Sequence, residues 1–226
     1  MNKLLSMQKS HNLTSHNKKI IKCKKCKRLS SYIRQVAKKK PKRFKDQKYW
    51  ARPLPGFGDV NAKVLIVGLA PAAHGGNRTG RMFTGDSSGD WVAKVLYYNG
   101  FSNKPTSTHS NDGFHLIDAY ITAVLRCAPP KNKPLPSELE NCSDYLKNEL
   151  ELLQNVKVIV CLGRIAFFRV CKILEIKGEK FSHGHSFKNN ERIIICSYHP
   201  SRQNTQTGRL TWKQWNLIFK KTRELI

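Results

Sequence analysis

Residues 64–86 read VLIVGLAPAAHGGNRTGRMFTGD, and this stretch determines the fold that we predict for the rest of the chain. Its first four residues are apolar and indicate a short buried strand. Gly or Pro follows at positions 68, 71, 75, 76, 80 and 85, and such a run neither continues a strand nor fills a core. The chain therefore enters a backbone-rich loop at the carboxyl end of the strand, where open α/β sheets bind their ligands.

The same alternation of strand and helix patterns recurs along the chain. Apolar runs at 119–125, 156–162 and 193–196 indicate three further strands. Helical spacing of apolar residues indicates helices at 87–98, 137–153, 164–174 and 210–225. This alternation predicts an α/β fold, a single-domain three-layer α/β/α sandwich with a central, mostly parallel four-stranded sheet. The loops after the first, second and fourth strands then open at one edge of the sheet.

The charge of the chain indicates a polyanionic partner. Lys and Arg number 41 against 15 Asp and Glu in 226 residues, which gives a net charge of +26. Such an excess is typical of nucleic-acid-binding proteins. No run of 18 apolar residues exists, and residues 1–27 lack a hydrophobic signal region. We therefore expect a soluble, cytoplasmic protein without a membrane partner, and a monomer.

The basic residues are concentrated near the amino end. Residues 1–17 show no periodicity, and we expect them to be a disordered basic tail before a folded domain at 18–226. Residues 1–52 contain 18 Lys or Arg against the single acidic Asp46. Aromatic residues interleave with these cations, as in nucleic-acid-binding surfaces, at Tyr32, Phe44, Tyr49 and Trp50. A solvated basic helix held by the same aromatic residues is the alternative interpretation.

Two separated motifs give the chain a family resemblance. Residues 64–86, with GLAPA at 68–72, closely resemble motif 1 of the uracil-DNA glycosylase superfamily, in the form of its iron-sulfur family 5, the UDGb type. His199-Pro200-Ser201 is similar to the HPS motif of that superfamily, and the resemblance covers roughly residues 20–226. It implies a monofunctional DNA glycosylase that hydrolyses the N-glycosidic bond of uracil and other deaminated bases, such as hypoxanthine, to initiate base excision repair.

The resemblance also implies the site residues. Phe83 matches an aromatic residue that stacks on the flipped base, and His199 matches a histidine that stabilises the negative charge of the leaving base. His74 belongs to the same pocket wall in the family pattern. The other implied base-pocket residues are Gly68, Leu69 and Ala70, and the implied DNA contacts are Ser201, Arg202, Gln203 and Arg209.

Three positions depart from the patterns of related families. Ala70 replaces the water-activating Asp of the best-known glycosylases, and Leu69 replaces the Glu of the other cluster-bearing family. Without a carboxylate at these positions, we expect a dissociative reaction in which DNA phosphates and His199 stabilise the separated charges. Asn77 either orients a loosely held water or caps a turn. Ala123 replaces an Asn that reads the base edge, which predicts broad base tolerance.

The cysteines form two groups. Cys161, Cys171 and Cys196 lie in apolar runs, where a free thiol packs as a small hydrophobe. Cys23 and Cys26 form a C-x2-C pair, which needs another pair to hold a metal. The resemblance supplies Cys127 and Cys142, so that Cys23, Cys26, Cys127 and Cys142 are the implied ligands of a [4Fe-4S] cluster.

Alternatives remain open at this point. Spacing alone does not separate a four-cysteine zinc site from an iron-sulfur cluster. A non-catalytic iron-sulfur nucleic-acid-binding protein and an iron-sulfur electron carrier are the alternative functions.

Overall fold

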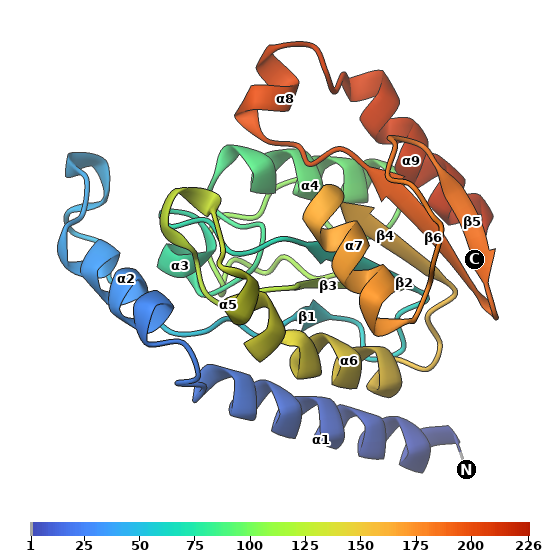
Figure 1. Cartoon of the computed structure of the whole chain (residues 1–226), viewed down its shortest axis with the longest axis horizontal. Coiled ribbons are helices and arrows are strands. Elements are labelled where there is room, and N and C mark those ends of the chain that lie inside the picture. The colour runs from blue at the N-terminus through green and yellow to red at the C-terminus, as the bar shows by residue number, and fades with distance from the viewer. Residues whose placement is uncertain (1) are drawn as a thin grey trace.

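A computed structural model describes the backbone of residues 2–226 and the side chains of Gln8 and of residues 10–226. Its sheet has six strands in the order β1-β3-β2-β4-β6-β5 (Figure 1). The bounds are β1 Phe57–Gly58, β2 Val64–Gly68, β3 Ala119–Ala123, β4 Val158–Leu162, β5 Ser186–Asn189 and β6 Arg192–Ser197. The inner four strands are parallel, with Val64 paired to both Ala119 and Val158, whereas β1 and β5 are antiparallel edges.

The sheet therefore has two more strands than we predicted. The four predicted strands are the parallel ones. The prediction missed β1, which has only two residues, and β5, whose sequence SFKN carries little apolar character. Both missed strands lie at sheet edges, where polar residues are tolerated because one side of the strand is not covered by a neighbour.

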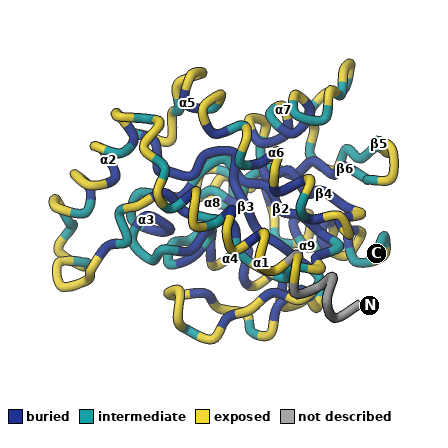
Figure 2. Tube along the Cα trace, turned by 90° about the horizontal axis from the view of Figure 1, so that it is seen from below, coloured by how far each residue is buried: buried dark blue, intermediate teal, exposed yellow. Residues whose placement is uncertain are grey.

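Helices cover both faces of the sheet, which confirms the three layers. Alternate residues of each strand point to opposite faces. Ile66 packs with α4 (Ser87–Tyr98) and α9 (Trp212–Glu224) in one core. Val67 packs with α6 (Ser143–Leu152) and α7 (Arg164–Ile173) in the other core. Figure 2 shows buried residues in the central strands and exposed residues along the outer helices and loops.

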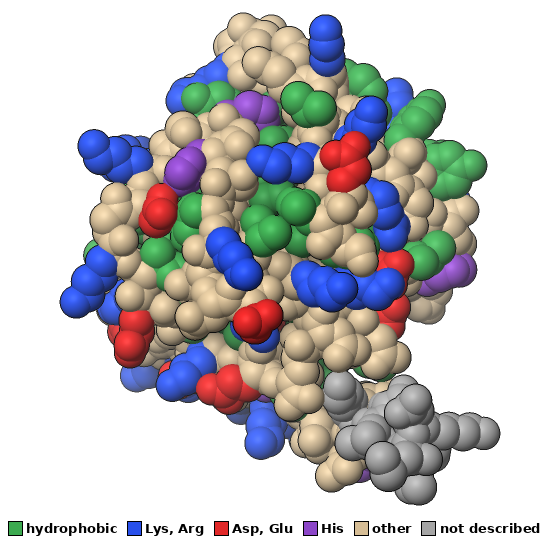
Figure 3. Space-filling view, turned by 90° about the vertical axis from the view of Figure 1, so that its right-hand side faces the viewer, with side chains coloured by type: hydrophobic (Ala, Val, Ile, Leu, Met, Phe, Trp, Pro, Cys, Tyr) green, Lys and Arg blue, Asp and Glu red, His purple; other side chains and the backbone are tan. Residues whose placement is uncertain are grey.

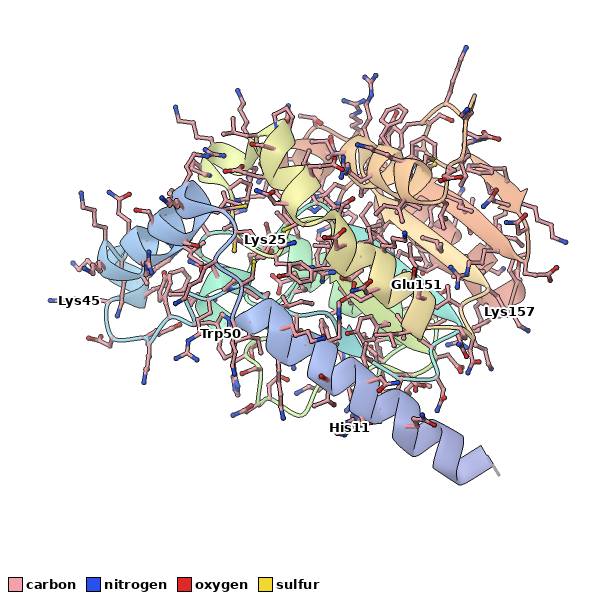
Figure 4. The ribbon with its side chains drawn as sticks, turned by 60° about the horizontal axis from the view of Figure 1, so that its bottom comes forward. His11, Lys25, Lys45, Trp50, Glu151 and Lys157 are labelled. Atoms are coloured by element: carbon pink, nitrogen blue, oxygen red, sulfur yellow. The ribbon has the colours of Figure 1, made fainter. Side chains whose placement is uncertain are left out.

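The amino-terminal segment forms a helix, α1 (Asn2–Ile21), where we predicted a disordered tail at 1–17. Leu13, His16 and Ile20 are buried, and their spacing places them on one face of this helix. That face packs along α6, as Figures 1 and 4 show from two directions. The prediction failed because only these few positions of α1 carry the pattern, among many polar residues.

A second amino-terminal helix, α2 (Lys27–Lys38), agrees with the alternative interpretation of this segment as a basic helix. Its buried residues Leu29 and Ile33 pack against the turn that follows β3. The predicted helix at 137–153 is two helices, α5 (Pro136–Asn141) and α6, which meet at Cys142. The short elements are α3 (Gly76–Thr79), α8 (Arg202–Gln206), η1 (Lys42–Phe44) and η2 (Pro130–Asn132). None of the helices within residues 2–226 combines the length and the hydrophobicity of a membrane span.

Candidate active site at the carboxyl edge of the sheet

One pocket of about 590 Å³ lies where the loops after β2, β4 and β6 meet the start of α4. From the parallel arrangement of the strands, we predicted that the motif loops would converge at this edge of the sheet. The motif residues that line it are Leu69, Ala70, Phe83, His199, Ser201, Arg202 and Gln203. The structure therefore brings the two sequence motifs together in a single cavity.

Phe83 is fixed in the pocket wall by two glycines. A Cβ on Gly68 would lie 2.7 Å from Cζ of Phe83, so only glycine lets the ring lie against the end of β2. Phe83 itself has φ of 47°, an uncommon value for an aromatic residue. A Cβ on Gly89 would lie 2.5 Å from the carbonyl oxygen of Phe83, which shows how closely α4 packs under this strained turn.

The turn that carries Phe83 is held by a buried ion pair. Nη2 of Arg81 donates to both carboxylate oxygens of Asp112 at 2.8 Å. Burial favours the neutral acid, but the hydrogen bonds from Arg81 and from the backbone N–H of Phe114 outweigh it and lower the pKa of Asp112. Arg81 thereby ties the motif loop to the loop that contains Asp112.

His199 faces Phe83 across the pocket. The ring centroids are 5.7 Å apart and the ring planes are inclined by 32°. Burial lowers the pKa of His199 to about 4, so the imidazole is neutral near pH 7. Its carbonyl oxygen accepts from Nδ2 of Asn204 at 2.8 Å, which fixes the backbone after β6. Among the residues whose side chains are described, none hydrogen-bonds to the ring nitrogens, so the neutral ring has an N–H available for a ligand.

The pocket contains a carboxylate that sequence reasoning missed. Asp86 lines it, although positions 69 and 70 carry none, as we expected. Oδ1 of Asp86 accepts from the N–H of Gly89 at 2.9 Å and caps α4. Burial raises the pKa of Asp86 above its ordinary value. The signal was present in the sequence as an Asp directly before the Ser-Ser start of a predicted helix.

Asn132 is a second missed pocket residue. It follows Lys131, and both have left-handed backbone angles, with φ of 56° and 53°. Two consecutive non-glycine residues in this conformation are rare in proteins, and residues with such strained backbone angles are concentrated at functional sites. We did not predict Asn132 from the sequence, because we interpreted the segment after Cys127 only as a cysteine-bearing turn.

The structure does not bring Asn77 to the pocket. Its side chain is fully buried, and Nδ2 donates to the carbonyl oxygens of Ile33 and Ala73, both at 3.3 Å. Asn77 therefore joins α2 to the motif loop. This placement agrees with the structural alternative for Asn77 and not with a water-orienting role in the base pocket.

His74 lies beside the base pocket and not in it. It lines an adjoining hollow of about 580 Å³ with Arg43, Phe44 and Lys131. The Nδ1 atom of His74 is 2.9 Å from the hydroxyl of Tyr49. Burial, and next the charges of Arg43 and Arg78, lower the pKa of His74.

Three of the four cysteines of the predicted cluster pack together between α2, the turn after β3 and the junction of α5 and α6. Cys127 and Cys142 are buried there, and Cys26 packs against them. Burial, and next the charges of Cys142, Cys23 and Cys26, raise the pKa of Cys127. Figure 4 shows sulfur atoms beside Lys25, which lies between Cys23 and Cys26. Among the described residues, no three His, Cys, Asp or Glu side chains are arranged around a single metal ion.

Salt bridges hold the same elements together. Arg28 of α2 contacts Glu138 of α5 at 2.6 Å, and Lys25 contacts Asp144 of α6 at 3.3 Å. The other three cysteines, Cys161, Cys171 and Cys196, are buried in the second core, as predicted.

Comparison with known proteins decides the family. A family model described as "Uracil DNA glycosylase superfamily" matches residues 55–221. The chain belongs to the uracil-DNA glycosylase superfamily. A protein of Pyrobaculum aerophilum named Type-5 uracil-DNA glycosylase is 47% identical over 193 residues, which cover 85% of this chain and 84% of that protein.

Two further relatives place the chain within the superfamily. A Type-5 uracil-DNA glycosylase of Thermus thermophilus is 45% identical over 206 residues, which cover 90% of this chain and 93% of that protein. A Type-4 uracil-DNA glycosylase of Archaeoglobus fulgidus is 31% identical over 155 residues, with 66% and 70% covered. The similarity is greater and longer for the type-5 proteins, in agreement with the motif-based resemblance.

Three of the four residues implied as DNA contacts line the base pocket, namely Ser201, Arg202 and Gln203, whereas Arg209 does not. Ser201 caps α8, and Nε of Arg202 donates to the hydroxyl of Ser87 at 3.2 Å. Arg209 lies over the ring of Tyr198, 4.6 Å from its centroid, and lines another hollow beyond His199. Figure 3 shows that Lys and Arg side chains also cover the face that includes the β5 edge, so cations are not confined to the pocket.

Proposed function

We propose that this protein is a monofunctional DNA glycosylase that hydrolyses the N-glycosidic bond of uracil and of other deaminated bases, such as hypoxanthine, in DNA. The observation that carries the proposal is the pairing of Phe83 and His199 across one pocket at the carboxyl edge of the sheet. Membership of the uracil-DNA glycosylase superfamily supports the same reaction class. A target base in a duplex must leave the stack to enter this pocket, at a cost of about a few kcal/mol.

Phe83 and His199 have different tasks in the proposed reaction. The Phe83 ring offers an apolar stacking surface to the flipped base. A neutral His199 donates its N–H to the base as negative charge develops on it, and a donor held in position before the reaction stabilises the transition state more than the ground state. Since the pKa of His199 is about 4, it donates a hydrogen bond without being an imidazolium ion.

Asp86 is the side chain that we assign to the sugar side of the reaction. As the bond breaks, the deoxyribose acquires oxocarbenium character, and an ionised carboxylate in the pocket stabilises that positive charge. Asp86 also has a second carboxylate oxygen, besides the one that caps α4, for the proton of an attacking water. The dissociative reaction expected from the sequence is kept, but Asp86, instead of Asn77, orients the attacking water and accepts its proton.

The pocket supports broad base selection. At about 590 Å³ it exceeds the volume of a pyrimidine or a purine base. Ala123 at the end of β3 is buried and supplies no amide to read a base edge. Selection then depends on how easily a damaged or mismatched base leaves the stack, which favours deaminated bases over intact pairs.

We also propose that Cys23, Cys26, Cys127 and Cys142 hold a [4Fe-4S] cluster. The donor set supports this proposal, because Cys26, Cys127 and Cys142 pack together and Cys23 precedes Cys26 by three residues. The irons of a cluster each take one thiolate, so its ligands lie farther apart than those around one zinc ion. The cluster would supply a covalent link between α2 and the body of the domain, and we assign it no step in the reaction.

The test is excision by the purified protein. Duplexes with one uracil or one hypoxanthine are incubated with excess protein and then treated with alkali, which cleaves the DNA only at abasic sites. We expect cleavage at both bases and none without alkali, as a monofunctional enzyme requires. Binding without abasic sites in either duplex would contradict the proposal and support the non-catalytic nucleic-acid-binding alternative.

A further inference from the structure

The hollow that contains His74 adjoins the base pocket, and its chemistry differs from that of the pocket. Ala72, Asp86, Ser87, Asn132 and Arg202 line both cavities, so the two are continuous. The base pocket presents Phe83 and apolar residues of α7, whereas the hollow presents cations and the aromatic rings of Tyr32 and Phe44. A DNA strand whose flipped base enters the pocket has its sugar-phosphate backbone at this junction.

Two of the cations in the hollow have no ion pair or hydrogen bond within the described protein, although the guanidinium of Arg43 lies over the Phe44 ring, 4.7 Å from its centroid. Arg43 and Lys131 are exposed, and neither forms an ion pair or a hydrogen bond with any residue between 10 and 226. Lys131 stands on the strained left-handed turn with φ of 53° that also presents Asn132. Asp86 and Asp90 line the α4 side, where one carboxylate oxygen of Asp86 caps that helix.

The wall of the hollow is rigid. Arg78 stacks on Phe44, with its guanidinium carbon 4.2 Å from the ring centroid. The same guanidinium donates to the carbonyl oxygens of His74 and Gly85 and to the side chain of Gln47. The donors of Arg78 are therefore occupied by protein acceptors, and Arg43 and Lys131 are the cations that can bind a ligand.

His74 adds a neutral donor. The Tyr49 hydroxyl has no other acceptor among the described residues, so we assign its proton to the bond with Nδ1 of His74. The proton of the neutral imidazole is then on Nε2. A neutral N–H beside two unpaired cations is a suitable set of donors for a phosphate oxygen.

We propose that this hollow binds the phosphate on one side of the flipped nucleotide, with Arg43, Lys131 and Nε2–H of His74 as its donors. The inference rests on the proposed glycosylase function and assigns His74 to the DNA backbone instead of the base. Charge alone does not locate the strand, because cations cover other faces as well (Figure 3). The residues that the hollow shares with the base pocket place it beside the flipped nucleotide.

The experiment measures binding to a duplex that carries a tetrahydrofuran abasic analogue. Five versions are compared: one unmodified, and four in which one of the two nearest linkages on either side is a neutral methylphosphonate. We expect the wild-type protein to lose about 10-fold in affinity with one of the four, the low end of the effect of a charge-assisted hydrogen bond. The Arg43→Ala/Lys131→Ala variant should bind the unmodified duplex about 10-fold more weakly and lose nothing further at that linkage.

Lys157→Ala is the matched control. Lys157 is an exposed lysine just before β4, at the opposite edge of the sheet from the pocket (Figure 4). This variant should show the wild-type pattern with all five duplexes. In a plot of the logarithm of affinity against the logarithm of salt concentration, the slope for the double variant should be about one unit shallower than for the wild type, because one phosphate contact is lost.

Two results would overturn the inference. One is wild-type affinity of the double variant for the unmodified duplex, and the other is an equal loss for variant and wild type at every methylphosphonate. Uracil excision by the wild-type preparation is measured alongside. If excision is present and the coupling absent, only this inference fails; if excision is absent, the proposed function fails.

Discussion

His199 is the residue on which the proposed chemistry depends most. It was predicted from the family resemblance, and the structure adds that burial keeps it neutral and that Phe83 faces it. We expect His199→Ala to reduce single-turnover excision of uracil by about 100- to 1000-fold, the effect of removing one preorganised donor to a developing anion. His115→Ala, which removes an exposed histidine from another loop, is the control and should excise at the wild-type rate. A His199→Ala enzyme as fast as the control would refute the assigned role.

The same histidine makes stability depend on pH. Its folded pKa of about 4 lies below the ordinary 6.5, so the unfolded chain binds the extra proton between these values. This contribution to stability is complete above pH 6.5 and is lost as the pH falls toward 4. Between pH 7.5 and pH 5, the wild type should lose about 2 kcal/mol more of its free energy of unfolding than His199→Ala does. Urea unfolding at both pH values measures this, and equal losses would show that burial does not perturb the imidazole.

Substitution of Asp86 tests whether the reaction needs a carboxylate in the pocket. Asn is as good an N-cap as Asp, so Asp86→Asn should leave α4 and the stability of the fold nearly unchanged. If the carboxylate stabilises the sugar cation and accepts the proton of water, excision should fall about 100-fold. If Asp86→Asn unfolds like the wild type and excises uracil equally fast, the reaction needs no carboxylate. The purely dissociative reaction that we inferred from the lack of a carboxylate at positions 69 and 70 would then hold.

Among the elements, α1 gives the clearest test of packing. Ile20 is fully buried under this helix, whereas its neighbour Lys19 is exposed. Ile20→Ala should lower the free energy of unfolding by about 2 to 5 kcal/mol, as for other large-to-small changes in a core. Lys19→Ala should change it by less than about 0.5 kcal/mol. Matching urea midpoints for the two variants would mean that α1 adds nothing to the stability of the domain.

Elements with strong patterns could be predicted from the sequence, and weak ones could not. The strand at 64–67 and the helix at 87–98 have continuous or periodic apolar residues, and they occur at β2 and α4. In α1 the pattern rests on a few positions, and in β1 it has only two residues, so tertiary contacts decide both. The edge strands and α1 therefore could not be predicted from local patterns, whereas α2 has the helical spacing Leu29, Ile33 and Val36 that could have indicated it.

For the molecule as a whole, motif order predicted which loops would meet, but not which side chains would face the pocket. Phe83 and His199 lie where the resemblance implied. Asn77 and His74 belong to the same motif loop, yet they point to α2 and to the adjoining hollow. The direction of a side chain on an irregular loop depends on distant partners such as Ile33 and Tyr49, and one motif contains no information about them.

The proposed four-cysteine site would join three segments of the chain, so its loss should lower the stability of the whole domain. Cys142 is 5% exposed, and Cys171, in the other core, has the same exposure. Both changes to Ala remove a buried sulfur, but only Cys142→Ala removes a proposed cluster ligand. Without the cluster, α2 keeps its salt bridges and apolar contacts but not its link to Cys127 and Cys142.

We therefore expect freshly purified wild-type protein and Cys171→Ala to be brown, with broad absorption in the blue, and Cys142→Ala to be pale. Cys171→Ala should lower the free energy of unfolding by about 1 to 2 kcal/mol. Cys142→Ala should lower it by at least several times as much, because metal binding contributes directly to folding. A colourless wild-type protein with stoichiometric zinc would replace the cluster by the zinc site, since both use the same thiolates. A colourless protein without metal, in which the two variants unfold alike, would reject any metal at these cysteines.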